Sequence, residues 1–301
     1  MRLREISRKP LPFSRCDERF RQPFRAHHLD RARNDRLRRE HQRRRICKEM
    51  IYGEARGCFM AVKRGHMVSR GYISAWADDK NRVDVIDVQD NRGITTAVGN
   101  ATVVSYVYDP KVLTHDLERA YWEIEDKGIP VVAKLRDGAE IISDIERAAL
   151  IAFLDMHLER GRYADQVNLR VPAVLMMKNG TRRDAELALG DVLTLSQSRP
   201  DVFRLSSLTL DQWEWRVLQA EGLATGDGAV LLWRPTKDAE ICTVSFPLSP
   251  TRLLVIGRDL PDRLPLNARV AQNSRRWIVG TKGALNLAWA NARESSPKPT
   301  G

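Results

Sequence analysis

Residues 143–160, SDIERAALIAFLDMHLER, carry the strongest local signal in the chain. Ser143 followed three residues later by Glu146 is a capping-box pattern, which marks the start of a helix. The pattern predicts a helix that runs to about Arg160. We expect its apolar side to consist of Ile145, Ala149, Ala152, Phe153 and Met156.

The residues around this helix predict a helical central section. Thr114 is a plausible N-cap, and apolar residues follow it at helical spacing up to Ile124. Pro130 is expected to interrupt that helix, which then continues over 131–135 after a kink. Two further helices are predicted over 165–177 and 184–196.

Both flanks of the central section read as β structure. Residues 82–88 alternate with period two, a turn follows at 91–93, and 94–98 is expected to return as a hairpin partner. Another strand-like run covers 102–108. On the C-terminal side the predicted strands are 213–217, 229–233, 241–246, 253–256 and 277–279. The predicted helices there are 268–274 and a closing helix over 282–292.

This order of elements predicts an α+β fold. Its mainly antiparallel sheet is expected to be formed by the N- and C-terminal thirds of the body, around the central helical section. We expect one domain over residues 60–292, followed by a disordered tail over 293–301.

Charge is concentrated at the N-terminus. Residues 1–59 hold 16 Arg and 2 Lys against 8 acids, a net charge of +10, whereas the other 242 residues hold 32 basic and 31 acidic groups. Three interpretations of this arm stay open. The first is that these residues lie upstream of the true translation start, which would be Met60. The second is a disordered, solvated arm, and the third is a basic strip that neutralises the phosphates of a nucleic acid. Nucleic acid is therefore expected as a partner only through residues 1–59.

Composition excludes several classes of protein. No apolar run approaches the roughly 20 residues of a membrane span, so no membrane partner is expected. Four cysteines in 301 residues do not make a disulfide scaffold and predict a cytoplasmic location. The glycine-rich motifs of dinucleotide and P-loop sites, the G-x-S-x-G elbow and the H-E-x-x-H metal motif are all missing from the sequence.

Three segments resemble a widespread bacterial family known only as a domain of unknown function. Residues 66–77 resemble its H-x-V-P-Q-x-Y-L-R-x-F opening, 225–230 its T-S-D-N-P-V segment, and 246–250 its F-P-L-S-P segment. Residues 117–130 and 153–160 are similar to two helices of the family, with Ile124-Glu125 and Arg160 at matching places. The resemblance covers about residues 64–280 and implies an order of segments, but no reaction or substrate.

Four residues are candidates for chemistry, each with a structural alternative. His66 would act as an acid/base group, or would fix the first turn of the domain through a backbone hydrogen bond. Glu125 would be a buried base or metal ligand, or a solvated acid. Asp227, between two glycines, would meet a substrate or metal, or would cap backbone N–H groups. Arg160 would bind an anion, or would complement its helix end.

Three hypotheses about function follow. If the four residues converge, they supply an acid/base group, a carboxylate pair able to hold a divalent metal and an anion-binding cation, as in a hydrolase for a phosphodiester or similar anionic substrate. The second hypothesis is a non-catalytic binding or scaffold domain. The third is nucleic-acid binding through the Arg-rich arm.

Overall fold

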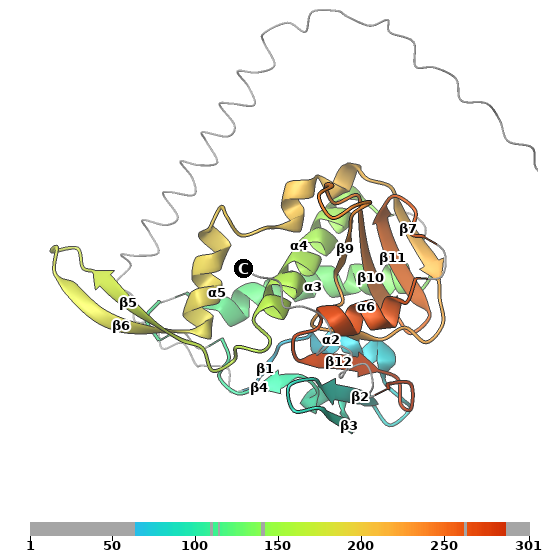
Figure 1. Ribbon diagram of the computed structural model, residues 1–301, viewed down its shortest axis with the longest axis horizontal. Helices are drawn as coiled ribbons and strands as arrows, with labels where there is room; N and C mark the ends of the chain where they lie inside the picture. The colour runs from blue at the N-terminus through green and yellow to red at the C-terminus, as the bar shows by residue number, and fades with distance from the viewer. Residues whose placement is uncertain (1–63, 109–110, 114, 140–141, 262–263, 287–301) are drawn as a thin grey trace, which may run out of the picture. The chain divides into compact units, whose positions relative to one another are not determined.

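The computed structural model describes residues 64–108, 111–113, 115–139, 142–261 and 264–286. The chain divides into two units, Met1–Lys48 and Glu49–Gly301, and all described residues belong to the second. The expectations for residues 1–59 and 293–301 therefore lie outside the described residues. The α+β class is confirmed, because helices occupy the middle of the sequence and antiparallel strands lie on both sides (Figure 1).

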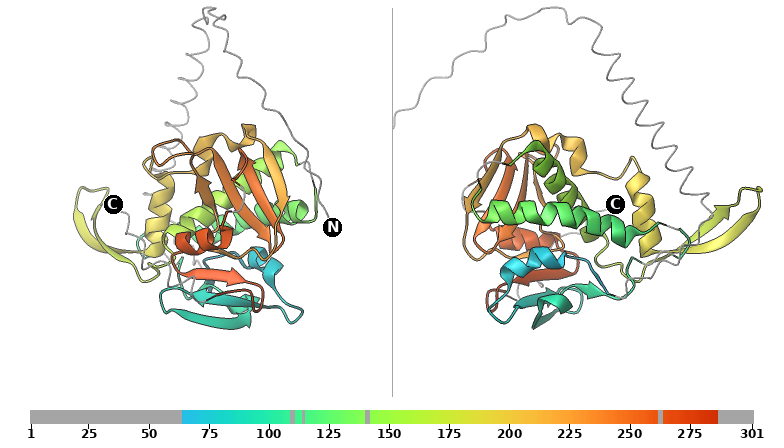
Figure 2. Two further views of the ribbon diagram at one scale, coloured as in Figure 1. Left: turned by 45° about the vertical axis from the view of Figure 1, so that its right-hand side comes forward. Right: turned by 180° about the vertical axis from the view of Figure 1, so that it is seen from behind.

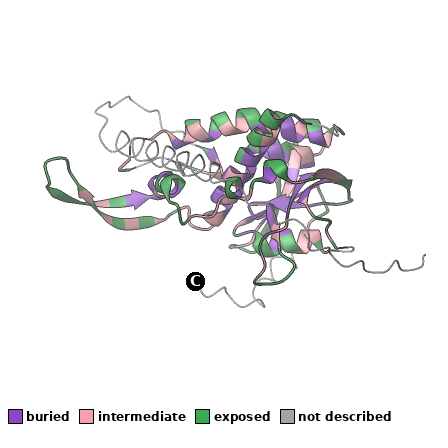
Figure 3. Cartoon of the chain, turned by 90° about the horizontal axis from the view of Figure 1, so that it is seen from above, coloured by how far each residue is buried: buried purple, intermediate pink, exposed green. Residues whose placement is uncertain are grey.

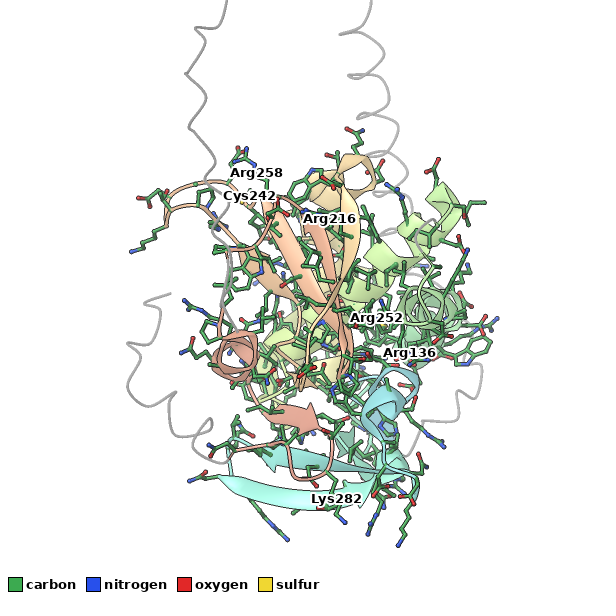
Figure 4. The ribbon with its side chains drawn as sticks, turned by 90° about the vertical axis from the view of Figure 1, so that its right-hand side faces the viewer. Arg136, Arg216, Cys242, Arg252, Arg258 and Lys282 are labelled. Carbon is green, nitrogen blue, oxygen red and sulfur yellow. The ribbon has the colours of Figure 1, made fainter. Side chains whose placement is uncertain are left out.

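One four-stranded antiparallel sheet comes entirely from the C-terminal third. Its order is β7 (Trp215–Gln219), β11 (Arg252–Gly257), β10 (Thr243–Ser249) and β9 (Leu231–Trp233). Every residue of β10 is buried, although its sequence alternates between apolar residues and Thr, Ser or Pro. Figure 4 views this sheet from the side of β7 and β11, with Arg216 and Arg252 labelled on the two strands.

A second four-stranded antiparallel sheet joins distant parts of the chain. Its order is β3 (Arg92–Ala97), β2 (Arg82–Asp87), β12 (Trp277–Gly280) and β8 (Thr225–Gly226). In this sheet Ile278 of β12 lies opposite both Ile86 of β2 and Gly226 of β8. Strands from the N- and C-terminal thirds therefore pair in this sheet, as expected. The structure differs from the expectation in having a second four-stranded sheet that is formed by the C-terminal third alone.

Two long helices form the centre of the structure. They are α3 (Leu117–Arg136) and α4 (Asp144–Arg162), which pack together (Figure 2). Gly128 of α3 permits this approach, because a Cβ there would lie 2.5 Å from Cβ of Phe153. The capping box of α4 is confirmed: the Ser143 hydroxyl accepts from the Glu146 amide, and the Glu146 carboxylate accepts from the Ser143 amide.

Two expectations about these helices are wrong. Pro130 does not interrupt α3, which continues through it to Arg136. The apolar side expected for α4 is wrong in part: Phe153 and Met156 are buried as expected, but Ile145 is 83% exposed and Ala152 is exposed. The buried side also contains Leu150, Leu154 and His157. Expected N-cap Thr114 lies outside the described residues, and Asp116 caps α3 by accepting from the Arg119 amide.

The predicted helix over 165–177 is wrong, and the one over 184–196 is wrong over residues 184–188. A hairpin is formed there by β5 (Arg170–Met176) and β6 (Arg182–Ala188). Pro172 disfavours a helix interior, whereas β-branched Val171 and Val174 favour a strand. Helix α5 (Leu189–Ser198) starts only after the hairpin, where the Asp191 carboxylate accepts from the Ala188 amide.

The remaining elements are short. They are β1 (Gly65–His66), which pairs with β4 (Val103–Val104), the helices α2 (Arg70–Ile73) and α6 (Leu266–Asn273), and 3-10 turns at Ser74–Trp76, Val98–Asn100, Leu205–Leu208 and Leu210–Gln212. Of the strand expected over 102–108, only β4 forms. No helix forms over 282–286, and the rest of the expected closing helix lies outside the described residues.

The core connects α2 and α4 to the first sheet. Tyr72 of α2 stacks on Phe246 of β10, with ring centres 4.7 Å apart, and His157 meets both rings edge-on. The Tyr72 hydroxyl donates to the Pro247 carbonyl at 2.6 Å. His157 Nε2 donates to the Gly226 carbonyl at 2.8 Å, so α4 is also attached to β8 (Figure 3 shows the buried strands and helix faces).

His157 is expected to make stability depend on pH. Burial lowers its pKa from 6.5 to about 4, an effect that the Gly226 carbonyl only partly opposes. As the pH falls from 6.5 towards 4, the unfolded chain binds a proton that the folded imidazole resists, so stability is lost in that window. We expect the contribution of His157 to the free energy of unfolding, measured with urea, to be about 2 kcal/mol smaller at pH 5 than at pH 7.

The comparison that isolates this effect is His157→Gln against the unsubstituted chain at both pH values. Buried Asp227, whose pKa burial raises to about 7, acts in the opposite direction and is common to both proteins. A pH dependence of the free energy of unfolding that is unchanged by the substitution would contradict the assignment to His157.

The described residues contain one cysteine, Cys242, whose thiol is free and lies at the end of the first sheet beside Arg258 (Figure 4). Across the described segments, the structure contains no helix with the length and apolar character that a bilayer span requires.

Candidate functional site

His66 lies in β1, opposite Val103 of β4. Its Nδ1 is 3.0 Å from the Ala101 carbonyl, and the Tyr108 hydroxyl donates to the His66 carbonyl at 2.9 Å. Because a carbonyl can only accept, Nδ1 carries the proton, and Nε2 of the neutral ring is left with its lone pair. Among the described groups, none forms a hydrogen bond with Nε2.

The environment keeps this imidazole neutral. Burial lowers the pKa of His66 below 6.5, and the nearby cations Arg70 and Arg160 lower it further. The Ala101 carbonyl and the Glu125 carboxylate act in the opposite direction but are outweighed. The structure therefore presents an unprotonated, half-buried nitrogen base at neutral pH.

Arg160 of α4 and Glu125 of α3 form an ion pair next to His66. Nη1 of Arg160 donates to Oε1 of Glu125 at 2.5 Å, and the Arg160 residue is 3% exposed. The guanidinium carbon lies 4.3 Å from the ring centre of Tyr121 and 5.1 Å from that of Tyr108. Burial opposes the charge, but Tyr108 and Glu125 outweigh it and raise the pKa of Arg160. Its Nε has no hydrogen-bond partner among the described residues.

Glu118 is a site residue that the sequence analysis missed. It precedes Tyr121 by three positions and Glu125 by seven, so the three share one face of α3. Burial raises the pKa of Glu118, Arg160 lowers it, and Glu125 raises it. Its Oε2 is buried with no described hydrogen-bond partner. The seven-residue spacing between Glu118 and Glu125 is the sequence pattern that could have identified Glu118 as a neighbour of the site.

Asp227 occupies a different environment. Its carboxylate accepts from the Arg276 amide at 2.8 Å and from the Arg275 amide at 3.1 Å. These bonds correspond to the second role considered for Asp227 in the sequence analysis, in which its carboxylate caps backbone N–H groups. Within the described residues, no hydrogen bond or ion pair joins the Asp227 side chain to His66, Glu125 or Arg160. The structure thus pairs Arg160 with Glu125, places His66 within the electrostatic influence of both, and uses the Asp227 carboxylate in a turn.

A second polar cluster lies on the other side of Tyr121. The buried Glu159 carboxylate accepts from the Tyr121 hydroxyl at 3.2 Å, from Nη2 of Arg204 at 2.9 Å and from the Ser196 hydroxyl. Tyr121 therefore touches Arg160 through its ring and Glu159 through its hydroxyl. Glu159, Arg204 and Ser196 were not singled out from the sequence, because their partners lie 37 to 45 residues apart in the chain.

A cavity of about 870 Å³ adjoins this second cluster. It lies between α3, α4 and the segment that follows α5, and Tyr121, Glu159 and Arg204 line it. Ligand cavities commonly fall in the range of about 300–1,000 Å³, so the size suits a small molecule or a few side chains.

The first cluster has the parts of an acid/base site. It combines a nitrogen base, a carboxyl group with a raised pKa and a guanidinium held between two aromatic rings. In the described segments, no group of three or more His, Cys, Asp or Glu side chains is placed to hold a metal ion. Glu125 and Asp227 were expected to form a carboxylate pair for a divalent metal. No contact described above joins these two side chains.

Comparisons with known proteins agree with the resemblance noted in the sequence. Searches of curated proteins and of solved structures found no match. One family profile, described as "Protein of unknown function (DUF4238)", matches residues 64–284. This range covers most of the chain, includes His66, Glu118, Glu125, Arg160 and Asp227, and extends four residues beyond the resemblance. The chain belongs to the DUF4238 family.

Proposed function

We propose that the protein is an acid/base hydrolase that acts on an anionic substrate, with a phosphodiester as the substrate class. The observation that carries the proposal is the buried Arg160–Glu125 ion pair between α4 and α3, whose two charges act in opposite directions on the pKa of His66 in β1.

Each group has a role that its surroundings support. Nε2 of His66, neutral and without a described partner, would take a proton from water as that water attacks the substrate. Arg160 would stabilise the negative charge of the substrate with a guanidinium that Glu125 and the two tyrosines hold in place. Glu118 would deliver a proton to the leaving group, a role for which burial raises its pKa in the required direction.

The His66→Gln variant tests the proposal directly. With bis(p-nitrophenyl) phosphate as substrate, we expect kcat/KM to fall by at least about 100-fold, since removal of a general base typically costs that much. The matched control is His115→Gln, which removes an imidazole that has no described contact with the cluster. Both variants should unfold at the same urea concentration as the unsubstituted chain.

Two outcomes would count against the hydrolase. One is equal hydrolysis by the unsubstituted chain and the His66→Gln variant. The other is an absence of turnover with both this diester and the carboxylic ester p-nitrophenyl acetate, for protein whose folding is verified by circular dichroism.

A non-catalytic scaffold domain is the second candidate function. The observation in its favour is that Asp227 serves a turn and that Arg160 is packed between Tyr108 and Tyr121, as in a structural ion pair. If the protein is a scaffold, the His66→Gln substitution should change neither turnover nor ligand binding.

The proposal of nucleic-acid binding concerns residues 1–59, outside the described residues. It requires a DNA or RNA affinity that falls with rising salt and is lost when residues 1–59 are deleted.

A further inference from the structure

The β5–β6 hairpin presents apolar side chains without a partner. Its two strands pair only with each other among the described strands, and it extends away from the other elements (Figures 1 and 3). Val174 is 58% exposed, Met176 56% and Met177 45%. A two-stranded hairpin is marginally stable alone, and exposed apolar side chains of this size mark interaction surfaces.

The tip of the same hairpin is cationic. Residues 175–183 contain two Arg and one Lys but no acid, whereas over the whole hairpin three Arg and one Lys stand against Asp184 and Glu186. Arg182 lies directly opposite Met176 in the antiparallel register, so a cation and an apolar side chain are neighbours on one face. Arg182 and Arg183 are exposed and have no ion-pair partner among the described residues.

The cavity beside Glu159 has the complementary character. Its apolar lining includes Ile124, Ile151, Met156 and Leu210. Four acids also line it: Asp144, Asp155, Glu159 and Asp211. Arg204 pairs with Glu159, and the Asp155 carboxylate accepts from the Leu205 and Ser206 amides. The exposed carboxylates of Asp144 and Asp211 have no ion-pair partner in the described part of the chain.

The apolar surface continues from the cavity along α4. Ile145, 83% exposed, precedes Ala148 by three residues and Ala152 by seven, so it lies on the same helix face as these two lining residues. The structure therefore contains one apolar, cationic projection and one apolar, anionic recess, and no described residue covers the apolar surface of either.

We propose that a second copy of this chain docks its β5–β6 hairpin in this cavity. Met176 and Met177 would cover the apolar lining, while Arg182 and Arg183 would meet Asp144 and Asp211. A nucleic acid would satisfy the arginines but not the methionines, and it would be repelled by the acids of the cavity. If each copy places its hairpin in the cavity of the other, the assembly closes as a two-fold dimer.

Charge reversal in the full-length chain tests this interface. Sedimentation velocity from 1 to 100 μM in 0.15 M salt, after nuclease treatment, should show a dimer for the unsubstituted protein. The hairpin variant Arg182→Glu/Arg183→Glu should raise the dimer Kd at least about 10-fold, because like charges then face each other. The cavity variant Asp144→Lys/Asp211→Lys should do the same. Arg92→Glu, at an exposed site on β3, is the matched control and should leave Kd unchanged.

Mixing the two variants gives the decisive result. A hairpin made acidic meets a cavity made basic in one direction, and the unsubstituted hairpin and cavity meet in the other, so a 1:1 mixture should form a heterodimer. A monomer at every concentration, a dimer that ignores both reversals, or a mixture that stays monomeric would each overturn the proposal.

Discussion

Gly161→Ala is expected to destabilise the protein by about 2–4 kcal/mol, more than a typical overpacked core substitution, or to prevent folding. A Cβ at this position of α4 would lie 2.1 Å from the Asp227 carbonyl oxygen and 3.2 Å from its carbon. Both atoms belong to backbone, and hydrogen bonds to residues 275–277 hold the loop around Asp227 in place. The strain therefore cannot be relieved by rotation of a flexible side chain.

Urea unfolding followed by tryptophan fluorescence measures this effect. The control is Gly99→Ala, where an added Cβ meets nothing within 4 Å, and we expect a change within about 0.5 kcal/mol there. A Gly161→Ala protein that unfolds within about 1 kcal/mol of the unsubstituted chain would show that α4 does not depend on this close approach.

Arg160→Met is expected to cost about 3 kcal/mol of stability, as for other buried ion pairs that lose one partner. The substitution removes two cation–π contacts and leaves the Glu125 carboxylate, whose side chain is only 23% exposed, without its guanidinium. The double variant Arg160→Met/Glu125→Leu should recover part of the loss, because no unpaired carboxylate then remains.

A double-mutant cycle from urea denaturation gives the coupling energy between the two side chains. Arg119→Met/Glu123→Leu, an exposed ion pair on α3, is the reference cycle, and its coupling should stay below about 1 kcal/mol. Similar coupling energies in both cycles would contradict the view that the buried pair organises the site.

The sequence predicted elements whose causes are local. The capping box at Ser143 and the alternation over 82–88 depend on neighbours a few residues away, and both elements form as expected. The helices expected over 165–177 and at 184–188 failed because apolar residues of the β5–β6 hairpin can satisfy either periodicity over so few positions. Pro172 was the local evidence against a helix.

The site could be predicted only in part, since convergence is a long-range property. His66, Glu125 and Arg160 were candidates because of family segments, not because their meeting could be calculated from spacing. Glu118 was missed, although it follows the same helical repeat as Glu125. The role of the Asp227 carboxylate as a backbone cap depends on the amides of residues 275 and 276. These lie almost 50 positions away, and no local sequence pattern connects them to Asp227.

The second sheet also has a consequence for synthesis of the chain on the ribosome. Strand β12 lies between β2 and β8, although almost 200 residues separate Ile86 from Ile278. Strands β2 and β3 emerge early as a hairpin, yet their inner edge stays open until nearly all of the matched segment has left the exit tunnel. This sheet therefore closes only after β12 has left the tunnel, and until then the nascent hairpin exposes a strand edge that a chaperone could protect.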